Sequence, residues 1–197
     1  MQPNVPAPLL PALNRYLELL ERWNKIHALT ALPIEARFEE LILDSAALLP
    51  FLEPLPPGSR VVDFGTGMGV PAIVLACARP DIEVLALDKS HKKLAFLKQA
   101  ALELGQNNLI PIAGRAEELP SLKAAMGTAK AVGTAELLIS WWERHALPGA
   151  PLMLLKGPEW NKETLPPGWT GHAHPYELPT KGQRCVLVLE QTLQKAR

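Results

Sequence analysis

Three glycines alternate with larger residues directly after an apolar run that ends in an acid. The apolar pair Val61-Val62 precedes Asp63, and the glycines that follow are Gly65, Gly67 and Gly69. Glycine lets the backbone turn tightly and approach a ligand that a Cβ atom would keep away. A second apolar run, residues 84–87, ends at Asp88, whose carboxylate can accept hydrogen bonds from both hydroxyls of a ribose. The pattern predicts a binding site for a cofactor that contains a nucleoside.

The glycine spacing discriminates between classes of nucleoside cofactor. A dinucleotide fingerprint places its third glycine three residues after the second, where this chain has Val70. We therefore do not expect a nicotinamide dinucleotide. The string from Asp63 to Gly69 resembles instead the first motif of class I S-adenosylmethionine methyltransferases, and this cofactor has no pyrophosphate that would need a helix N-terminus. Glycines alone can also mark an ordinary strand-to-helix turn, but the order strand, acid, glycines, helix, strand and acid favours the cofactor site.

Composition indicates one domain with a substantial core. The chain has 197 residues, 48% hydrophobic and 20% charged, which is ample for one core and short for two. Cys77 and Cys185 lie in apolar runs, as expected of reduced thiols in the cytoplasm. The first residues do not resemble a signal peptide, and no apolar run is long enough to span a membrane. The formal net charge is zero, so contacts with nucleic acid would depend on local basic patches.

Apolar periodicity predicts helices ahead of an alternating α/β region. An amphipathic helix over residues 8–27 and a second helix after Pro33 form a helical cap, residues 1–53. A proline-rich linker leads to the core, residues 59–197, and the whole chain forms a single domain. The strands expected in the core are 60–64, 82–87, 109–113, a less clear one near 130–132, and 152–155. The helices expected there end near 78, run from Ser90 to Gly105, and cover 116–125 and 134–146.

Alternation of strands and helices implies an α/β fold with a mostly parallel sheet covered by helices on both faces. The tail, residues 169–190, contains two further strand-like runs, of which 185–190 is the clearer. Two consecutive strands suit a C-terminal antiparallel hairpin. The sequence therefore predicts a Rossmann-like core that ends in a hairpin.

Short strings along the chain resemble those of one family. They are Trp23-Asn24-Lys25 with Leu29-Thr30, Leu43-Asp44-Ser45, Asp63 to Pro71, Lys92-Lys93 with Phe96-Leu97, Arg115 to Glu118, and Lys156-Gly157. In this order, and over nearly the whole length, they resemble the small-subunit ribosomal RNA methyltransferase G family, also called glucose-inhibited division protein B. The resemblance implies a class I methyltransferase fold with a seven-stranded sheet. It also implies methyl transfer from S-adenosylmethionine to N7 of a guanine in 16S ribosomal RNA.

The resemblance also assigns residues to the site. The implied cofactor-binding residues are Asp63, Gly65, Thr66, Gly67, Gly69, Val70, Asp88, Ala116 and Glu117, the last two matching a pair that flanks the adenine. The implied substrate-binding residues are Asp44, Ser45, Arg115, Lys156 and Arg184. For Asp44 and Ser45, a role in tying the cap to the sheet remains an alternative. The implied partner is 16S ribosomal RNA or the small ribosomal subunit, without membrane or metal, and we expect a cytoplasmic monomer.

Departures from the family strings cluster on the substrate side. Lys130 stands where the family has the arginine of S-R-A-F, and Leu41 stands where it has a histidine. We expect Lys130 to act as the catalytic residue by supplying positive charge to the RNA or the cofactor, although a lysine lacks the planar fork of an arginine. The departures leave two alternatives open. One is a diverged methyltransferase acting on another RNA or a small molecule, and the other is a protein that binds S-adenosylmethionine without catalysis.

Methylation at guanine N7 fits a chain without a general base. N7 carries an in-plane lone pair on the base edge, and no proton has to leave before it attacks a methyl group. Positioning alone can contribute ~7–11 kcal/mol to such a reaction. His172 and His174 lack cysteine or carboxylate partners at the spacing of metal ligands, so we expect no metal site.

Three further features have a structural and an RNA-binding interpretation. The basic residues Lys89, His91, Lys92, Lys93 and Lys98 form either a solvated helix face or a contact for RNA beside the cofactor site. Trp141-Trp142 suits packing better than base stacking, and the cluster Arg22 to Lys25 suits a helix end better than an RNA contact.

Overall fold

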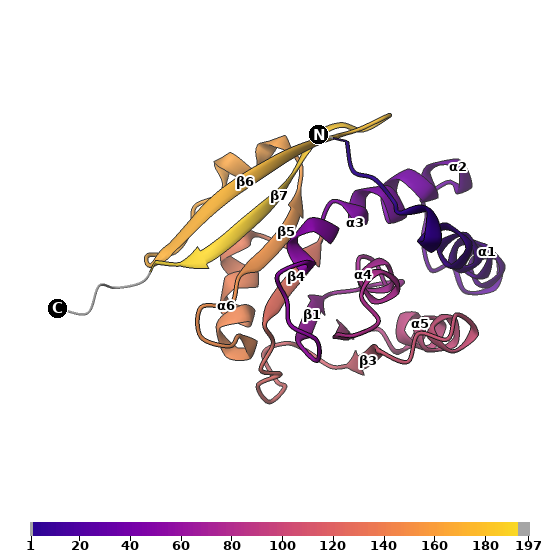
Figure 1. The fold of residues 1–197 in the computed structure, drawn as a ribbon, viewed down its shortest axis with the longest axis horizontal. Helices are drawn as coiled ribbons and strands as arrows, with labels where there is room; N and C mark the ends of the chain where they lie inside the picture. Colours follow the sequence, from indigo (N-terminus) through magenta and orange to yellow (C-terminus); the bar gives the residue numbers. More distant parts are fainter. Residues whose placement is uncertain (1, 193–197) are drawn as a thin grey trace.

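A single sheet runs through the computed structural model, which describes residues 2–192 (Figure 1). Its strands lie in the order β3-β2-β1-β4-β5-β7-β6. The parallel strands are β1 (Arg60–Phe64), β2 (Glu83–Asp88), β3 (Leu109–Ala113), β4 (Met126–Lys130) and β5 (Leu152–Lys156). The antiparallel strands are β6 (Trp169–Leu178) and β7 (Gly182–Gln191). The expected seven-stranded, mostly parallel sheet with a C-terminal hairpin is confirmed.

Different helices cover the two faces of the sheet. The longer ones are α1 (Leu10–His27), α4 (Ala72–Ala78), α5 (His91–Glu103) and α6 (Ala135–His145). Successive side chains of a strand point to opposite faces. Val61 therefore packs in one apolar cluster with α1, α4 and α5, whereas Val62 and Phe64 pack in another with α6. As expected, Ser90 caps α5, because its hydroxyl accepts a hydrogen bond from the N–H of Lys93.

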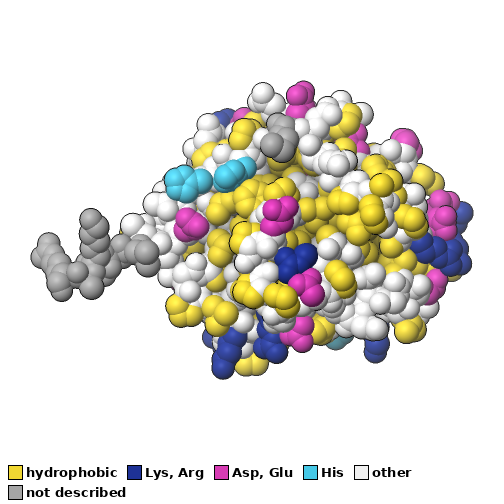
Figure 2. All heavy atoms as spheres, viewed as in Figure 1, with side chains coloured by type: hydrophobic (Ala, Val, Ile, Leu, Met, Phe, Trp, Pro, Cys, Tyr) yellow, Lys and Arg dark blue, Asp and Glu magenta, His cyan; other side chains and the backbone are white. Residues whose placement is uncertain are grey.

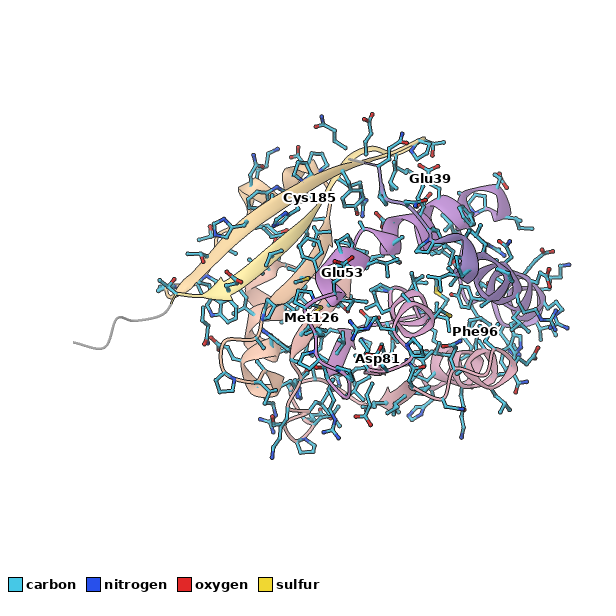
Figure 3. All side chains as sticks on the ribbon, viewed as in Figure 1. Glu39, Glu53, Asp81, Phe96, Met126 and Cys185 are labelled. Atoms are coloured by element: carbon cyan, nitrogen blue, oxygen red, sulfur yellow. The ribbon has the colours of Figure 1, made fainter. Side chains whose placement is uncertain are left out.

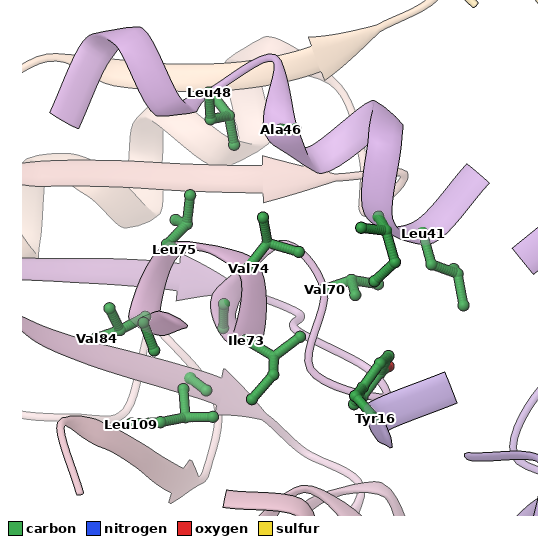
Figure 4. Close-up of a cluster of buried hydrophobic side chains, with 14 of the residues drawn as sticks. Tyr16, Leu41, Ala46, Leu48, Val70, Ile73, Val74, Leu75, Val84 and Leu109 are labelled. Carbon is green, nitrogen blue, oxygen red and sulfur yellow. The ribbon is translucent and has the colours of Figure 1, made fainter. Parts of the chain in front are cut away.

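Apart from α1, the segment ahead of the sheet consists of short helical pieces. They are η1 (Ala7–Leu9), α2 (Ile34–Arg37), the π-helical η2 (Phe38–Leu43), α3 (Asp44–Ala46) and η3 (Leu49–Leu52). The helix expected after Pro33 does begin there, at Ile34. Leu41 and Leu48 from this segment and Tyr16 from α1 lie around α4 in one buried cluster (Figure 4). The N-terminal helices therefore share a core with the sheet.

Two expectations between β3 and α6 need correction. Residues 116–125 do not form a helix; they turn and then continue without regular secondary structure to an isolated bridge between Ala124 and Ala146. Pro120 disfavours helical geometry at the residue before it, which explains this difference. The fourth strand is Met126–Lys130 and lies ahead of the expected position near 130–132. β4 is rich in small residues, so it lacks the apolar pattern by which a central strand is recognised in a sequence. Gly127 has no side chain because Trp142 packs directly against its backbone.

The β6–β7 hairpin is fastened to the N-terminal segment at its tip. The carboxylate of Glu39 accepts hydrogen bonds from the N–H and hydroxyl of Thr180, at 2.7 and 2.8 Å. Lys181 forms an ion pair with Glu40 at 2.7 Å. Figure 3 shows Glu39 close to this tip.

A further 3-10 turn, η4 (Pro158–Lys162), follows β5.

An apolar hollow of about 500 Å³ lies between the N-terminal segment, η3 and the hairpin. It is lined by Pro3, Pro6, Phe51, Pro175 and Tyr176 among others. Figure 2 shows a broad band of hydrophobic side chains across this side of the molecule. Within residues 2–192 no helix combines the length and the hydropathy that crossing a membrane requires.

Candidate active site

A cavity of about 410 Å³ opens at the carboxyl ends of the parallel strands. Ligands of open α/β sheets bind at this edge, and this volume lies in the range of small-molecule sites, about 300–1,000 Å³. The cavity is lined by Phe64, Gly65, Leu87, Asp88, Lys89, Lys93, Gly114, Arg115, Ala116, Glu117, Ala131, Val132 and Trp141. Of the residues predicted from the sequence, Gly65, Asp88, Arg115, Ala116 and Glu117 thus meet in one cavity.

The glycine loop between β1 and α4 uses its glycines for different purposes. All three have positive φ, at +63° for Gly65, +59° for Gly67 and +104° for Gly69. A Cβ on Gly69 would lie 2.2 Å from Leu97 of α5, and one on Gly65 would lie 2.7 Å from Val132. A Cβ on Gly67 would meet nothing closer than 3.9 Å. Gly69 therefore serves packing, whereas Gly67 leaves open space beside the loop.

The predicted residues Asp63, Thr66 and Val70 are buried and do not line the cavity. Asp63 is fully buried, and its Oδ1 accepts a hydrogen bond from the hydroxyl of Thr128 at 3.0 Å. Burial raises the pKa of Asp63 to about 7, although the hydroxyls of Thr66 and Thr128 lower it. Asp63 therefore ties β1 to β4 below the cavity.

Asp88 is positioned by the backbone on both sides. Its Oδ2 accepts a hydrogen bond from the N–H of Gly67, and its Oδ1 accepts one from the N–H of Ser90, both at 2.8 Å. Each carboxylate oxygen has a second lone pair that can accept another hydrogen bond. The carboxylate is therefore held at the cavity wall and can still accept hydrogen bonds from a diol.

The lining of the cavity, which includes the residues at its opening that we call its mouth, carries more positive than negative side chains. Lys89, Lys93 and Arg115 belong to it, against the carboxylates of Asp88 and Glu117. The local excess contrasts with the zero net charge of the chain. A negatively charged polymer would be attracted to this mouth.

The predicted substrate residues Asp44 and Arg184 and the predicted catalytic residue Lys130 meet in a second cluster, outside the cavity lining. Asp44 is 2% exposed, and its carboxylate contacts Lys130 Nζ at 2.7 Å and Arg184 at 3.3 Å. The hydroxyl of Tyr176 donates a hydrogen bond to the same carboxylate at 2.6 Å. Lys130 also donates to the carbonyl of Glu40. Burial lowers the pKa of Lys130, against the raising effect of Asp44.

The two remaining predicted residues, Ser45 and Lys156, donate hydrogen bonds to backbone carbonyl groups. The hydroxyl of Ser45 donates to the carbonyl of Leu41 at 2.6 Å and is fully buried. Lys156 donates to the carbonyl of Gly133 at 2.9 Å and pairs with Glu163 at 2.7 Å. Lys156 thereby supports the loop after β4, whose residue Ala131 lines the cavity with a positive φ of 54°.

Sequence analysis missed several lining residues. Phe64 and Leu87 lie at the carboxyl ends of β1 and β2, so their position at strand ends was a usable signal. Trp141 belongs to an apolar stripe of α6, which resembles ordinary core. Tyr176 carries no local signal, because only the hairpin brings it to Asp44. Across the described part of the chain, no three His, Cys, Asp or Glu side chains gather in a way that could hold a metal ion.

Comparison with protein families gives one match that covers most of the chain. A family model described as rRNA small subunit methyltransferase G matches residues 9–166. The ribosomal RNA small subunit methyltransferase G of Neisseria gonorrhoeae is 35% identical over 158 residues, covering 80% of this chain and 75% of that protein. The protein of the same name from Legionella pneumophila is 32% identical over 180 residues, covering 90% and 85%.

Solved structures share the fold. TrmN from Thermus thermophilus superposes with a TM-score of 0.58 and 26% identity, over 83% of this chain and 55% of that one. An O-methyltransferase from Bacillus cereus in complex with SAH superposes with a TM-score of 0.60 at 14% identity, over 90% of this chain and 91% of that one. At this identity the second match bears on the fold alone.

Proposed function

Because this chain belongs to the rRNA small subunit methyltransferase G family, we propose that it transfers a methyl group from S-adenosylmethionine to N7 of a guanine in 16S ribosomal RNA. The observation that carries the proposal is the coincidence of that family match with one cavity. Gly65, Asp88 and the pair Ala116-Glu117 come from three separate segments and line it together.

The residues present fit S-adenosylmethionine. Asp88 offers lone pairs to a ribose diol, and Gly67 leaves room beside the loop. Leu87, Val132 and Trp141 give an apolar wall for a flat base near Ala116 and Glu117. When bound, the cofactor supplies an electrophilic methyl group on a sulfonium. The described residues that fit it are Gly65, Gly67, Asp88, Ala116 and Glu117, while Asp63, Thr66, Gly69 and Val70 shape the loop.

For this reaction the protein has to position the guanine and supply positive charge to the RNA. Guanine N7 needs no proton removed before it attacks, so a site without a general base is adequate. Lys89, Lys93 and Arg115 at the mouth suit the phosphates of an RNA strand. We assign Lys130 and Arg184 to the same task on the side of the Asp44 cluster. Lys130 then supplies positive charge to the RNA, with Asp44 as its partner in the RNA-free protein.

The substrate is 16S ribosomal RNA or the small ribosomal subunit. We further propose that the protein acts on it in the cytoplasm, where ribosomal subunits are assembled, and that it acts as a monomer. The monomer proposal rests on the cavity, because residues of one chain supply its base wall, its diol acceptor and its basic mouth.

A mapping experiment tests the function. Small subunits from a strain without guanine-N7 methylation of 16S ribosomal RNA are incubated with the protein and S-adenosylmethionine. The RNA is then treated with borohydride and aniline, which cleaves at N7-methylguanine. We expect one new cleavage in 16S ribosomal RNA with the parent protein, and a weaker one with Asp88→Ala when S-adenosylmethionine is limiting.

Two results would contradict the proposal. Methylation of another atom or molecule would favour a diverged methyltransferase. Binding of S-adenosylmethionine without methylation of naked RNA, particles or whole subunits would favour a non-catalytic binding protein. Mass mapping of 16S ribosomal RNA from cells with and without the gene provides the matching test in vivo.

A further inference from the structure

One side of the cavity, next to the apolar wall of Leu87, Val132 and Trp141, is formed by a segment without regular secondary structure. Residues 114–117 line the cavity, and the chain from there to Ala124 is neither helix nor strand. Such a segment would be mobile without side-chain anchors. The question is therefore what holds Ala116 at the cavity.

His145, at the end of α6, makes two hydrogen bonds to this segment. Its Nε2 lies 2.8 Å from the carbonyl oxygen of Ala116, and its Nδ1 accepts a hydrogen bond from the N–H of Leu122 at 3.3 Å. The ring is fully buried beside Phe64, with ring centroids 5.8 Å apart. One side chain thus bridges both ends of the segment.

The two contacts determine the tautomer of the ring. Nδ1 must carry the lone pair, because the N–H of Leu122 points at it. Nε2 therefore carries the proton and donates to the carbonyl of Ala116. Burial lowers the pKa of His145, and so does the charge of its neighbour Arg144, against the raising effect of the Ala116 carbonyl. A neutral imidazole satisfies both partners at once.

The helix that carries His145 also contributes to the cavity itself. Trp141 lies four residues earlier, on the same side of α6, and lines the cavity. The ring of Phe64, another lining residue, packs near both, with its centroid 6.1 Å from that of Trp141 and 5.8 Å from that of His145. The same helix therefore fixes two walls of the base end, one by contact and one through His145.

We propose that His145 is a positioning residue for the adenosine half of the cofactor, acting through the backbone of Ala116. This inference rests on the proposed function, since it takes S-adenosylmethionine as the cofactor. His145 does not reach the cavity, and its effect is to keep residues 114–117 at the distance that the base requires.

Binding measurements with two probes test the inference. S-adenosylhomocysteine and 5′-methylthioadenosine share the adenosine half, and the second lacks the amino-acid end. We expect His145→Ala to weaken both by tenfold or more and by the same factor. At saturating S-adenosylmethionine, the methylation rate of subunits should stay within about twofold of the parent rate. A loss of affinity without a loss of the saturated rate distinguishes positioning of the cofactor from a general loss of folded structure.

Two conservative variants separate the contacts. In His145→Gln the side-chain amide reaches the place of Nε2 and can still donate to Ala116. In His145→Asn the shorter amide reaches only the place of Nδ1 and can still accept from Leu122. We expect the glutamine variant to bind both probes within threefold of the parent and the asparagine variant to resemble alanine.

Trp142→Phe is the matched control. Trp142 is a fully buried neighbour on α6, and its Nε1 donates to the carbonyl of Ala150 at 3.2 Å. The change removes one hydrogen bond from the same helix without touching the segment at Ala116. It should lower the melting temperature and leave probe affinity unchanged.

The outcomes are distinct. A folded His145→Ala protein that binds both probes within twofold of the parent overturns the inference. If the alanine variant does not fold, the Gln and Asn pair decides, and equal affinities for these two overturn it. A parent that binds no S-adenosylhomocysteine overturns both this inference and the proposed function. A parent that binds it but methylates no ribosomal RNA overturns the proposed function alone.

Discussion

Two aspartates at the ends of neighbouring strands have different tasks. Asp63 of β1 pairs in register with Ala86, so it lies two residues before the level of Asp88. Asp63 is therefore covered by the glycine loop, whereas Asp88 lies at the cavity wall. A difference of two positions along the sheet separates a buried carboxyl group from one that lines the cavity.

Removal of the Asp88 carboxylate should weaken cofactor binding at least tenfold. Asp88→Ala loses two charge-assisted hydrogen bonds to the ribose, each worth about 1.5–3 kcal/mol. It also releases the N–H groups of Gly67 and Ser90. Calorimetric titration with S-adenosylhomocysteine measures the loss, and thermal melting controls for folding. Equal affinity in a folded variant would remove Asp88 from the site.

Asp63 should make the protein less stable as the pH rises from about 4 to 7. Its pKa is 3.8 ordinarily and about 7 in the folded protein, so the folded state holds the proton over this interval and the unfolded state does not. Asp63→Asn cannot titrate. The free energy of unfolding of the parent relative to this variant should therefore fall between these pH values and level off above 7. Urea titrations across the range provide the check, and a flat or rising difference would contradict the raised pKa.

At the scale of elements, the loop between β1 and α4 has two tasks within three residues. One glycine packs against a helix, and another leaves space for a ligand. Gly69 lies against Leu97 of α5, while Gly67 borders open space. The loop is also held from the N-terminal side, because the hydroxyl of Tyr16 donates to the carbonyl of Met68 at 3.2 Å. The two glycines therefore predict opposite consequences for the same substitution.

Alanine at Gly69 should damage the fold, and alanine at Gly67 should damage binding. Both substitutions place a side chain at positive φ, which costs about 1–2 kcal/mol. Only Gly69→Ala adds a clash, with its Cβ 2.2 Å from Leu97. We expect a clearly lower melting temperature for Gly69→Ala, and for Gly67→Ala a smaller thermal effect with a larger loss of S-adenosylhomocysteine affinity. Binding by Gly67→Ala at the parent level would show that the cofactor does not approach this residue.

At the scale of the whole molecule, the buried Asp44 carboxylate joins three parts of the chain. It comes from the N-terminal segment, Lys130 comes from β4, and Tyr176 and Arg184 come from the hairpin. A buried carboxylate with these partners is costly to disrupt, because removing one partner leaves charge uncompensated. The cluster thus ties the N-terminal segment, β4 and the hairpin together.

Lys130→Ala should lower both stability and single-turnover methylation, the latter by about tenfold or more. Loss of one charged hydrogen bond corresponds to about 1.5–3 kcal/mol. Lys130→Arg should retain both properties, because it keeps a cation beside Asp44 and restores the residue of the family string.

Lys181→Ala is the control for Lys130. It removes an ion pair with Glu40 on a more exposed lysine, and such pairs are worth about 0–1 kcal/mol. Its activity and melting temperature should be close to those of the parent. A Lys130→Ala protein that melts lower yet methylates at the parent rate would restrict Lys130 to a structural role.

Several residues that line the cavity were predictable from sequence, because they follow strands of a regular α/β pattern. The order strand, acid, glycines, helix describes one continuous segment, and the parallel sheet brings Gly65, Asp88 and Ala116 to one edge. The helix expected over residues 116–125 is absent, because its local preference competes with Pro120 and with contacts from α6.

The sequence by itself determined the sheet, its hairpin and the kind of cofactor. These features follow from apolar periodicity and glycine spacing, which are patterns among residues that are close in the sequence. Only the tertiary structure decided which predicted residues face the cavity and which support it. Asp44 and Tyr176 are 132 residues apart, and His145 and Ala116 are 29 apart. No local pattern relates such pairs. They are joined by the order of the strands and by the packing of α6 on one face of the sheet.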